Sequence, residues 1–69
     1  MDRQQAEAFA ENLKELACIE CTKGWLEKHD GVRDPIQDIK RCGDLGLITP
    51  ELEQRLIGEV ELIRLSPNQ

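Results

Sequence analysis

The sequence predicts an all-α fold, either a small three-helix domain or a helical hairpin. Three segments, residues 3–28, 35–45 and 50–65, carry apolar residues at the spacing of a helical face. Each segment follows a residue type that caps helix N-termini, and short turns join the segments. Because 69 residues leave room for one domain, we expect residues 1–69 to form a single helical domain.

The first predicted helix, residues 3–28, begins at a capping box made by Asp2 and Gln5. At about 100° per residue, its apolar residues form two sets on nearly opposite sides. The first set is Phe9, Leu13 and Leu16, and the second is Cys18, Cys21 and Trp25. The helix therefore either ends near Gly24 or continues to about Lys28 with its two halves buried against different neighbours.

The second predicted helix, residues 35–45, follows a turn expected at residues 29–32. Asp34 is a suitable N-cap, and Pro35 is favoured at the first helical position. The apolar positions are Ile36, Ile39, Cys42 and Leu45. Two glycines, at positions 43 and 46, offer places for this helix to end.

The third predicted helix, residues 50–65, follows the same pattern, with Thr49 as N-cap and Pro50 at the first position. Its apolar seam consists of Leu52, Leu56, Val60 and Ile63. Gly58 lies away from this seam, where it costs about 1 kcal/mol relative to alanine.

The charge of the chain limits its partners. Nine basic and fourteen acidic residues give a formal net charge of -5 and a pI of about 4.7. Such an acidic chain repels nucleic acids and anionic membrane surfaces, so we expect neither as a partner. No apolar run approaches the roughly 20 residues that span a bilayer, and residues 1–10 are too polar for a signal peptide. We therefore expect a cytoplasmic protein.

The cysteines allow a metal-binding alternative. Cys18, Cys21, His29 and Cys42 form a set of three thiols and one imidazole, the ligand types that zinc prefers. Because no second Cys-x-x-Cys follows, we expect no metal, and buried cysteines then act as small apolar residues. A redox Cys-x-x-Cys needs its first sulfur at a helix N-terminus, whereas about four turns of predicted helix precede Cys18.

The sequence contains no pattern typical of an enzyme. No nucleophile stands with a base, and the five glycines form no phosphate-binding loop. His29 lies in a charged stretch where a solvated imidazole is expected. We expect no catalytic residue, no cofactor and no small-molecule substrate.

Residues 34–56 resemble the SHOCT family, a short C-terminal domain of two small helices found in many bacterial and phage proteins. The resemblance rests on Asp34-Pro35-Ile36, on Ile39 and on the run from Leu45 to Leu52, which reads Leu-Gly-Leu-Ile-Thr-Pro-Glu-Leu. It departs from the family in a shorter first helix and in Pro50 and Leu52, which replace acidic and aromatic residues. It implies a role in oligomerisation or in attachment to a partner.

These observations predict a small, non-catalytic protein-interaction module, such as an adaptor, inhibitor or regulator of prokaryotic or phage origin. A core this thin favours association, either as a homodimer or with a protein partner. The two apolar sets of the first helix suggest that one of them faces another chain. The predicted interaction residues are Phe9, Leu13, Leu16, Cys21, Trp25 and Leu26. A zinc-stabilised regulator using the cysteines and His29 is the alternative.

Overall fold

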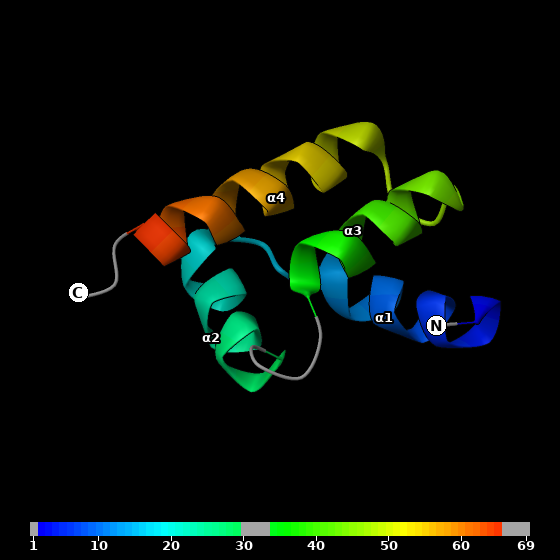
Figure 1. Ribbon diagram of the computed structural model, residues 1–69, viewed down its shortest axis with the longest axis horizontal. Helices are drawn as coiled ribbons and strands as arrows, with labels where there is room; N and C mark the ends of the chain where they lie inside the picture. Colours follow the sequence, from blue (N-terminus) through cyan, green and yellow to red (C-terminus); the bar gives the residue numbers. More distant parts are fainter. Residues whose placement is uncertain (1, 30–33, 66–69) are drawn as a thin grey trace.

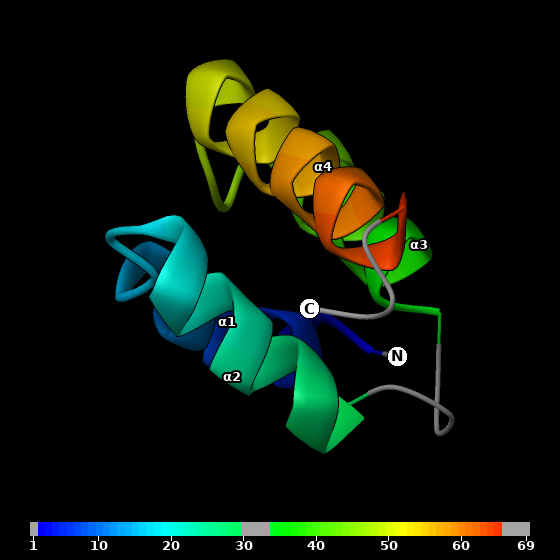
Figure 2. The same ribbon diagram turned by 90° about the vertical axis from the view of Figure 1, so that its left-hand side faces the viewer.

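The computed structural model describes residues 2–29 and 34–65, which form four α-helices in two layers (Figure 1). The helices are α1 (Arg3–Lys14), α2 (Ile19–His29), α3 (Pro35–Asp44) and α4 (Pro50–Leu65). α3 and α4 lie side by side in one layer, and α1 and α2 form the other (Figure 2). α1 packs against α3, and α2 packs against α4.

This architecture confirms the predicted all-α class, and the described residues contain no strand. None of the helices within residues 2–29 and 34–65 has the length and apolar character needed to cross a membrane. Most of the turn predicted at residues 29–32 lies outside the described residues.

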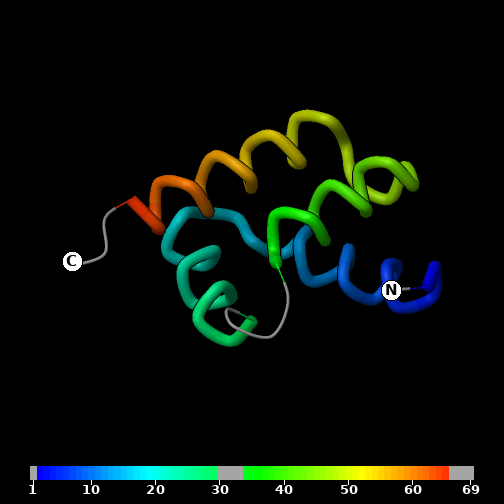
Figure 3. The backbone as a smooth tube through the Cα atoms, viewed as in Figure 1, coloured from blue at the N-terminus to red at the C-terminus, as the bar shows by residue number. Residues whose placement is uncertain are grey.

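The prediction of one continuous helix over residues 3–28 is wrong. The chain leaves the first helix after Lys14 and starts a second at Ile19, and the tube in Figure 3 changes direction between them. In a continuous helix, the two apolar sets would face nearly opposite ways. The break lets α1 pack against α3 and α2 against α4 separately, so that Leu13 and Trp25 are both buried, while Cys18 and Cys21 stay exposed. Each of the two buried side chains contributes about 1.5–3 kcal/mol through its burial.

New hydrogen bonds compensate for the helical ones lost at the break. The N–H groups of Glu15 and Leu16 donate to the carbonyls of Asn12 and Leu13, both at 3.1 Å, which closes α1, and the N–H of Thr22 donates to Cys18 O at 3.1 Å. The carbonyl of Leu16 accepts a hydrogen bond from the Arg55 guanidinium of α4. Local hydrogen bonds thus satisfy the N–H groups of Glu15 and Thr22, whereas the carbonyl of Leu16 depends on a residue distant in the sequence.

The predicted N-caps are confirmed. The side chain of Asp2 accepts from Gln5 N at 2.8 Å in a complete capping box, and that of Asp34 accepts from Ile36 N at 3.1 Å. Thr49 Oγ1 accepts from Leu52 N at 3.1 Å. Because these contacts span two or three residues, they are encoded locally.

The turn between α3 and α4 depends on one glycine. Gly46 has a φ of 74°, a left-handed conformation that favours glycine. Its N–H donates to Gly43 O at 3.0 Å, and the N–H of Leu47 donates to Cys42 O at 2.9 Å. This Schellman motif ends α3 and directs the chain back along it as α4.

The core is mostly aliphatic. Its buried apolar residues are Ala6, Ala10, Leu13, Leu16, Trp25, Leu26, Ile39, Cys42, Ile48, Leu56 and Val60. The seam predicted for the last helix is confirmed, since Leu56 and Val60 are fully buried and Leu52 and Ile63 pack against them. The sequence analysis missed Ala6 and Ala10, whose small side chains bring α1 close to α3. At that contact the Cys42 thiol lies 3.6 Å from the carbonyl oxygen of Ala6.

Candidate functional site

The six predicted interaction residues are not a free surface. Leu13, Leu16, Trp25 and Leu26 are buried within the chain itself. The other two differ, since Phe9 is partly buried against the core and Cys21 is exposed. The expectation that one whole apolar set stays uncovered by the chain assumed a straight first helix; the chain instead buries Leu13 and Trp25, one from each set, and leaves Cys18 and Cys21 exposed.

Trp25 is held in an aromatic cluster between α1 and α2. Its ring centroid lies 5.6 Å from that of Phe9 and 4.8 Å from that of His29. The His29 Nδ1 atom lies 3.0 Å from the Trp25 carbonyl oxygen, which can only accept, so Nδ1 carries the hydrogen. His29 is therefore half-buried and not fully solvated as the sequence analysis expected.

A shallow hollow of about 450 Å³ opens beside this cluster and is lined by Trp25 and His29. Its wall also includes Cys21, Leu16 and Lys28. Of the predicted interaction residues, only Cys21 both borders this hollow and is exposed.

The outer face of α4 carries exposed apolar side chains. Leu62 and Leu65 expose 59% and 79% of their surface, and they lie three residues apart on one side of the helix. Gly58 lies four residues before Leu62 on the same side, and a Cβ placed on it meets no atom within 4 Å. We call Gly58, Leu62 and Leu65 the outer stripe of α4. The sequence analysis noted Gly58 but missed both leucines. Their position outside the apolar seam of this helix could have shown that the core leaves them exposed.

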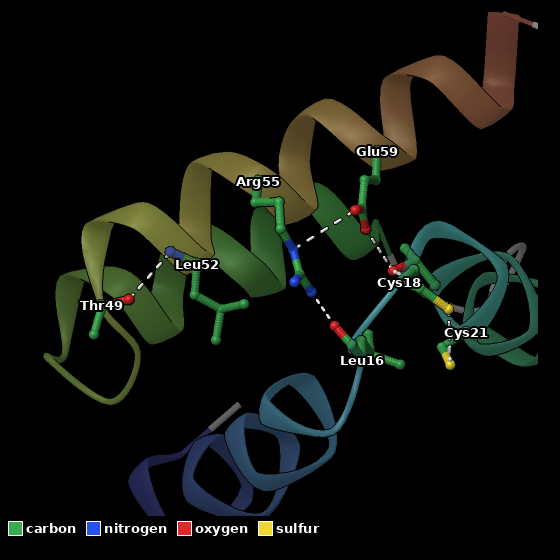
Figure 4. Close-up of polar contacts among 8 residues, drawn as sticks. Leu16, Cys18, Cys21, Thr49, Leu52, Arg55 and Glu59 are labelled. Carbon is green, nitrogen blue, oxygen red and sulfur yellow. Dashed lines mark hydrogen bonds and ion pairs between the residues drawn. The ribbon is translucent and has the colours of Figure 1, made fainter.

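A polar network joins α4 to the break between α1 and α2 (Figure 4). Arg55 donates to Leu16 O and lies 3.6 Å from the Glu59 carboxylate. Glu59 Oε1 accepts a 2.6 Å hydrogen bond from Thr22 Oγ1, which also lies 3.2 Å from Cys18 O. Thr22 is fully buried, so the network fixes the first turn of α2 against α4.

The four residues of the zinc alternative do not form one site. Cys18 and Cys21 are exposed and adjacent, with their sulfur atoms 3.4 Å apart. Cys42 is instead buried on α3 against α1, and burial raises the pKa of its thiol. The Nδ1 atom of His29 is engaged by Trp25. Over residues 2–29 and 34–65, no three or more His, Cys, Asp or Glu side chains gather as metal ligands would.

Comparison of the chain with protein-family models, with curated proteins and with solved structures finds no match. The helical hairpin implied by the SHOCT resemblance is present as α3 and α4. Membership of that family stays a prediction, and the function must be argued from the surface of the chain.

Proposed function

We propose that this chain is a small, cytoplasmic, non-catalytic protein-interaction module that pairs with a second copy of itself through the outer stripe of α4. The observation that carries the proposal is the exposure of Leu62 and Leu65 beside the bare backbone of Gly58. An apolar side chain left in water forgoes about 25 cal/mol for each Å² that a partner would cover.

The distribution of exposed apolar residues supports this choice of surface. Within residues 2–29 and 34–65, the large apolar side chains that are mainly exposed are Leu62, Leu65 and, to a smaller extent, Ile19 at 42%. Two of these three lie on one stripe of one helix. Gly58 extends that stripe and lets the backbone of another helix approach closely.

The pattern of the stripe is self-complementary, which favours a second copy as the partner. An antiparallel pair of α4 helices with its two-fold axis between residues 61 and 62 brings residue 58 of one copy opposite residue 65 of the other. Leu65 then fills the space above Gly58 of the second copy, and the two Leu62 side chains meet near the axis. Such reciprocal contacts are the rule in two-fold symmetric dimers.

Charge opposes this pairing and supplies a test. Each chain carries a formal net charge of -5, so two copies repel each other at low salt. Because added salt screens this repulsion, the dimer should strengthen as the salt concentration rises.

Two further observations support the proposal. The resemblance of residues 34–56 to the SHOCT family implies oligomerisation. The three thiols form no disulfide, which suits a reducing compartment such as the cytoplasm.

Sedimentation equilibrium over a range of micromolar concentrations, at low and high salt, tests the proposal. We expect a monomer–dimer equilibrium for the natural chain and a monomer for Leu62→Asp, since a charge in an apolar contact costs several kcal/mol to desolvate. Gln37→Asp is the matched control, because Gln37 is exposed on α3 and the change adds the same charge. The control should dimerise as the natural chain does.

Gly58→Leu provides an independent variant. The added side chain meets nothing within the monomer at its Cβ, and leucine favours a helix more than glycine does. The variant should therefore fold at least as stably as the natural chain and yet fail to dimerise. A natural chain that remains monomeric at every concentration and salt level would refute self-pairing, as would a Leu62→Asp variant that dimerises normally.

A further inference from the structure

The break between α1 and α2 gives Cys18 a position that the sequence analysis did not anticipate. Cys18 immediately precedes Ile19, the first residue of α2, and its carbonyl accepts the hydrogen bond from Thr22 N. It is thus the N-cap residue of α2. Asp2, Asp34 and Thr49 precede the other three helices, so here a thiol takes the place of a side-chain oxygen. The objection that Cys18 lies deep inside a helix no longer holds.

The second thiol of the pair lies within reach of the first. Cys21 is in the first turn of α2, and its sulfur atom is 3.4 Å from that of Cys18 (Figure 4). Both side chains are exposed, so an external reagent can reach them. Residues three apart at a helix start share one face, and only a short approach separates these sulfurs from the roughly 2.05 Å of a disulfide bond.

The environment favours Cys18 as the attacking group. Hydrogen bonding to the backbone N–H of Cys21, and then to its thiol, lowers the pKa of Cys18, whereas desolvation and, to a smaller extent, the charge of Glu20 oppose this shift. A thiolate at a helix N-terminus is also stabilised by the helix dipole. Cys42 provides the contrast, since it is buried and its pKa is raised.

We propose that Cys18 and Cys21 form a redox-active dithiol that reacts with low-molecular-weight disulfides such as oxidised glutathione. The Cys18 thiolate attacks one sulfur of the glutathione disulfide, breaks its S–S bond and releases one glutathione thiolate. Cys21 then loses its proton to solvent and attacks the Cys18 sulfur, which releases the second glutathione. The protein loses two electrons to form the Cys18–Cys21 disulfide, and the glutathione disulfide gains them.

This site is separate from the outer stripe of α4, so it does not depend on self-pairing. It lies at the start of α2, where Thr22 holds the carbonyl of Cys18 and the carboxylate of Glu59. A monomer and a dimer should therefore both react.

The test treats the folded, reduced chain with oxidised glutathione, unfolds samples in denaturant after increasing times to alkylate the thiols that remain, and maps the products by peptide mass. We expect the natural chain to lose two hydrogen atoms and to keep an alkylated Cys42, with little glutathione adduct at any time. Cys42 is the internal control, because it is present in every sample and shielded by the fold.

Two single variants separate the steps. Cys21→Ser should accumulate a stable glutathione adduct at Cys18, because no second thiol resolves it. Cys18→Ser should react at Cys21 at no more than about a tenth of the natural rate, because the more ionised thiol is gone. Circular dichroism should show both variants folded, as the two side chains are exposed.

Three outcomes would overturn the proposal. One is a natural chain that accumulates the glutathione adduct as Cys21→Ser does. Another is a Cys18→Ser variant that reacts at the natural rate. The third is a folded chain whose Cys42 is modified as fast as Cys18.

Discussion

Replacing Thr22 with valine should separate the polar network at the helix break from apolar packing. Thr22 is fully buried, and valine has nearly its shape, so the change removes the hydroxyl while leaving the packing nearly intact. The hydroxyl has one hydrogen to donate, and the 2.6 Å contact to the Glu59 carboxylate is shorter than the 3.2 Å contact to Cys18 O. The variant therefore loses a hydrogen bond to a charged group.

The expected cost follows from the surroundings of the acceptor. Hydrogen bonds to charged groups contribute about 1.5–3 kcal/mol. The Glu59 side chain is still 16% exposed and keeps Arg55 at 3.6 Å, so it retains other partners and the loss should lie near 1.5–2 kcal/mol. In a domain of this size, 1 kcal/mol shifts Tm by about 4–8 °C, so Thr22→Val should melt about 6–16 °C lower.

Urea unfolding, followed by far-ultraviolet circular dichroism and by the fluorescence of the single Trp25, measures this change. Thr22→Ser is the matched control, because it keeps the hydroxyl and loses only a methyl group worth about 0.8 kcal/mol. The valine variant should be the less stable of the two. If it equals or exceeds the serine variant in stability, the hydrogen bond to Glu59 does not hold α2 against α4.

Other substitutions test the remaining parts of the fold. Leu13→Asp and Trp25→Asp should each abolish the cooperative helical signal in thermal unfolding, because both side chains lie in the intramolecular core; a folded variant of either would contradict this assignment. Gly46→Ala should lower the free energy of unfolding by about 1–2 kcal/mol in urea, since φ is 74° there, and an unchanged value would disprove the need for glycine. Burial, and then the charge of Asp38, raise the pKa of Cys42, so the unfolded chain releases that proton first. The free energy of unfolding should therefore fall as pH rises above about 8.5, the ordinary thiol pKa, and less steeply in Cys42→Ala; equal slopes would count against this thiol as the cause.

The two proposals concern separate places on the chain, the outer stripe of α4 and the cysteine pair at the start of α2. Leu62 and Leu65 are absent from the six predicted interaction residues, because that prediction looked for unmatched faces only on the first helix. Both could have been found from the sequence, since neither falls at the spacing of Leu56 and Val60. What the sequence could not supply is the burial of Leu13 and Trp25 together.

Local chemistry determined most of the secondary structure. Asp2 and Thr49 cap helices through contacts that span three residues, and Gly46 ends α3 through hydrogen bonds that span three to five residues. The seam of α4 follows from the helical period alone. Such features are readable in the sequence because every atom involved lies within about one or two turns of the others.

Only the tertiary structure decided where the first helix breaks. No proline or glycine lies between Lys14 and Ile19, so local propensity does not require an interruption there. The break is favoured because it allows Leu13 and Trp25 to be buried together, and because Arg55, 39 residues away, satisfies the carbonyl of Leu16. The same event places Cys18 at a helix N-terminus. A contact with a partner so distant in sequence leaves no local periodic signal, because it exists only after α4 has packed against α2.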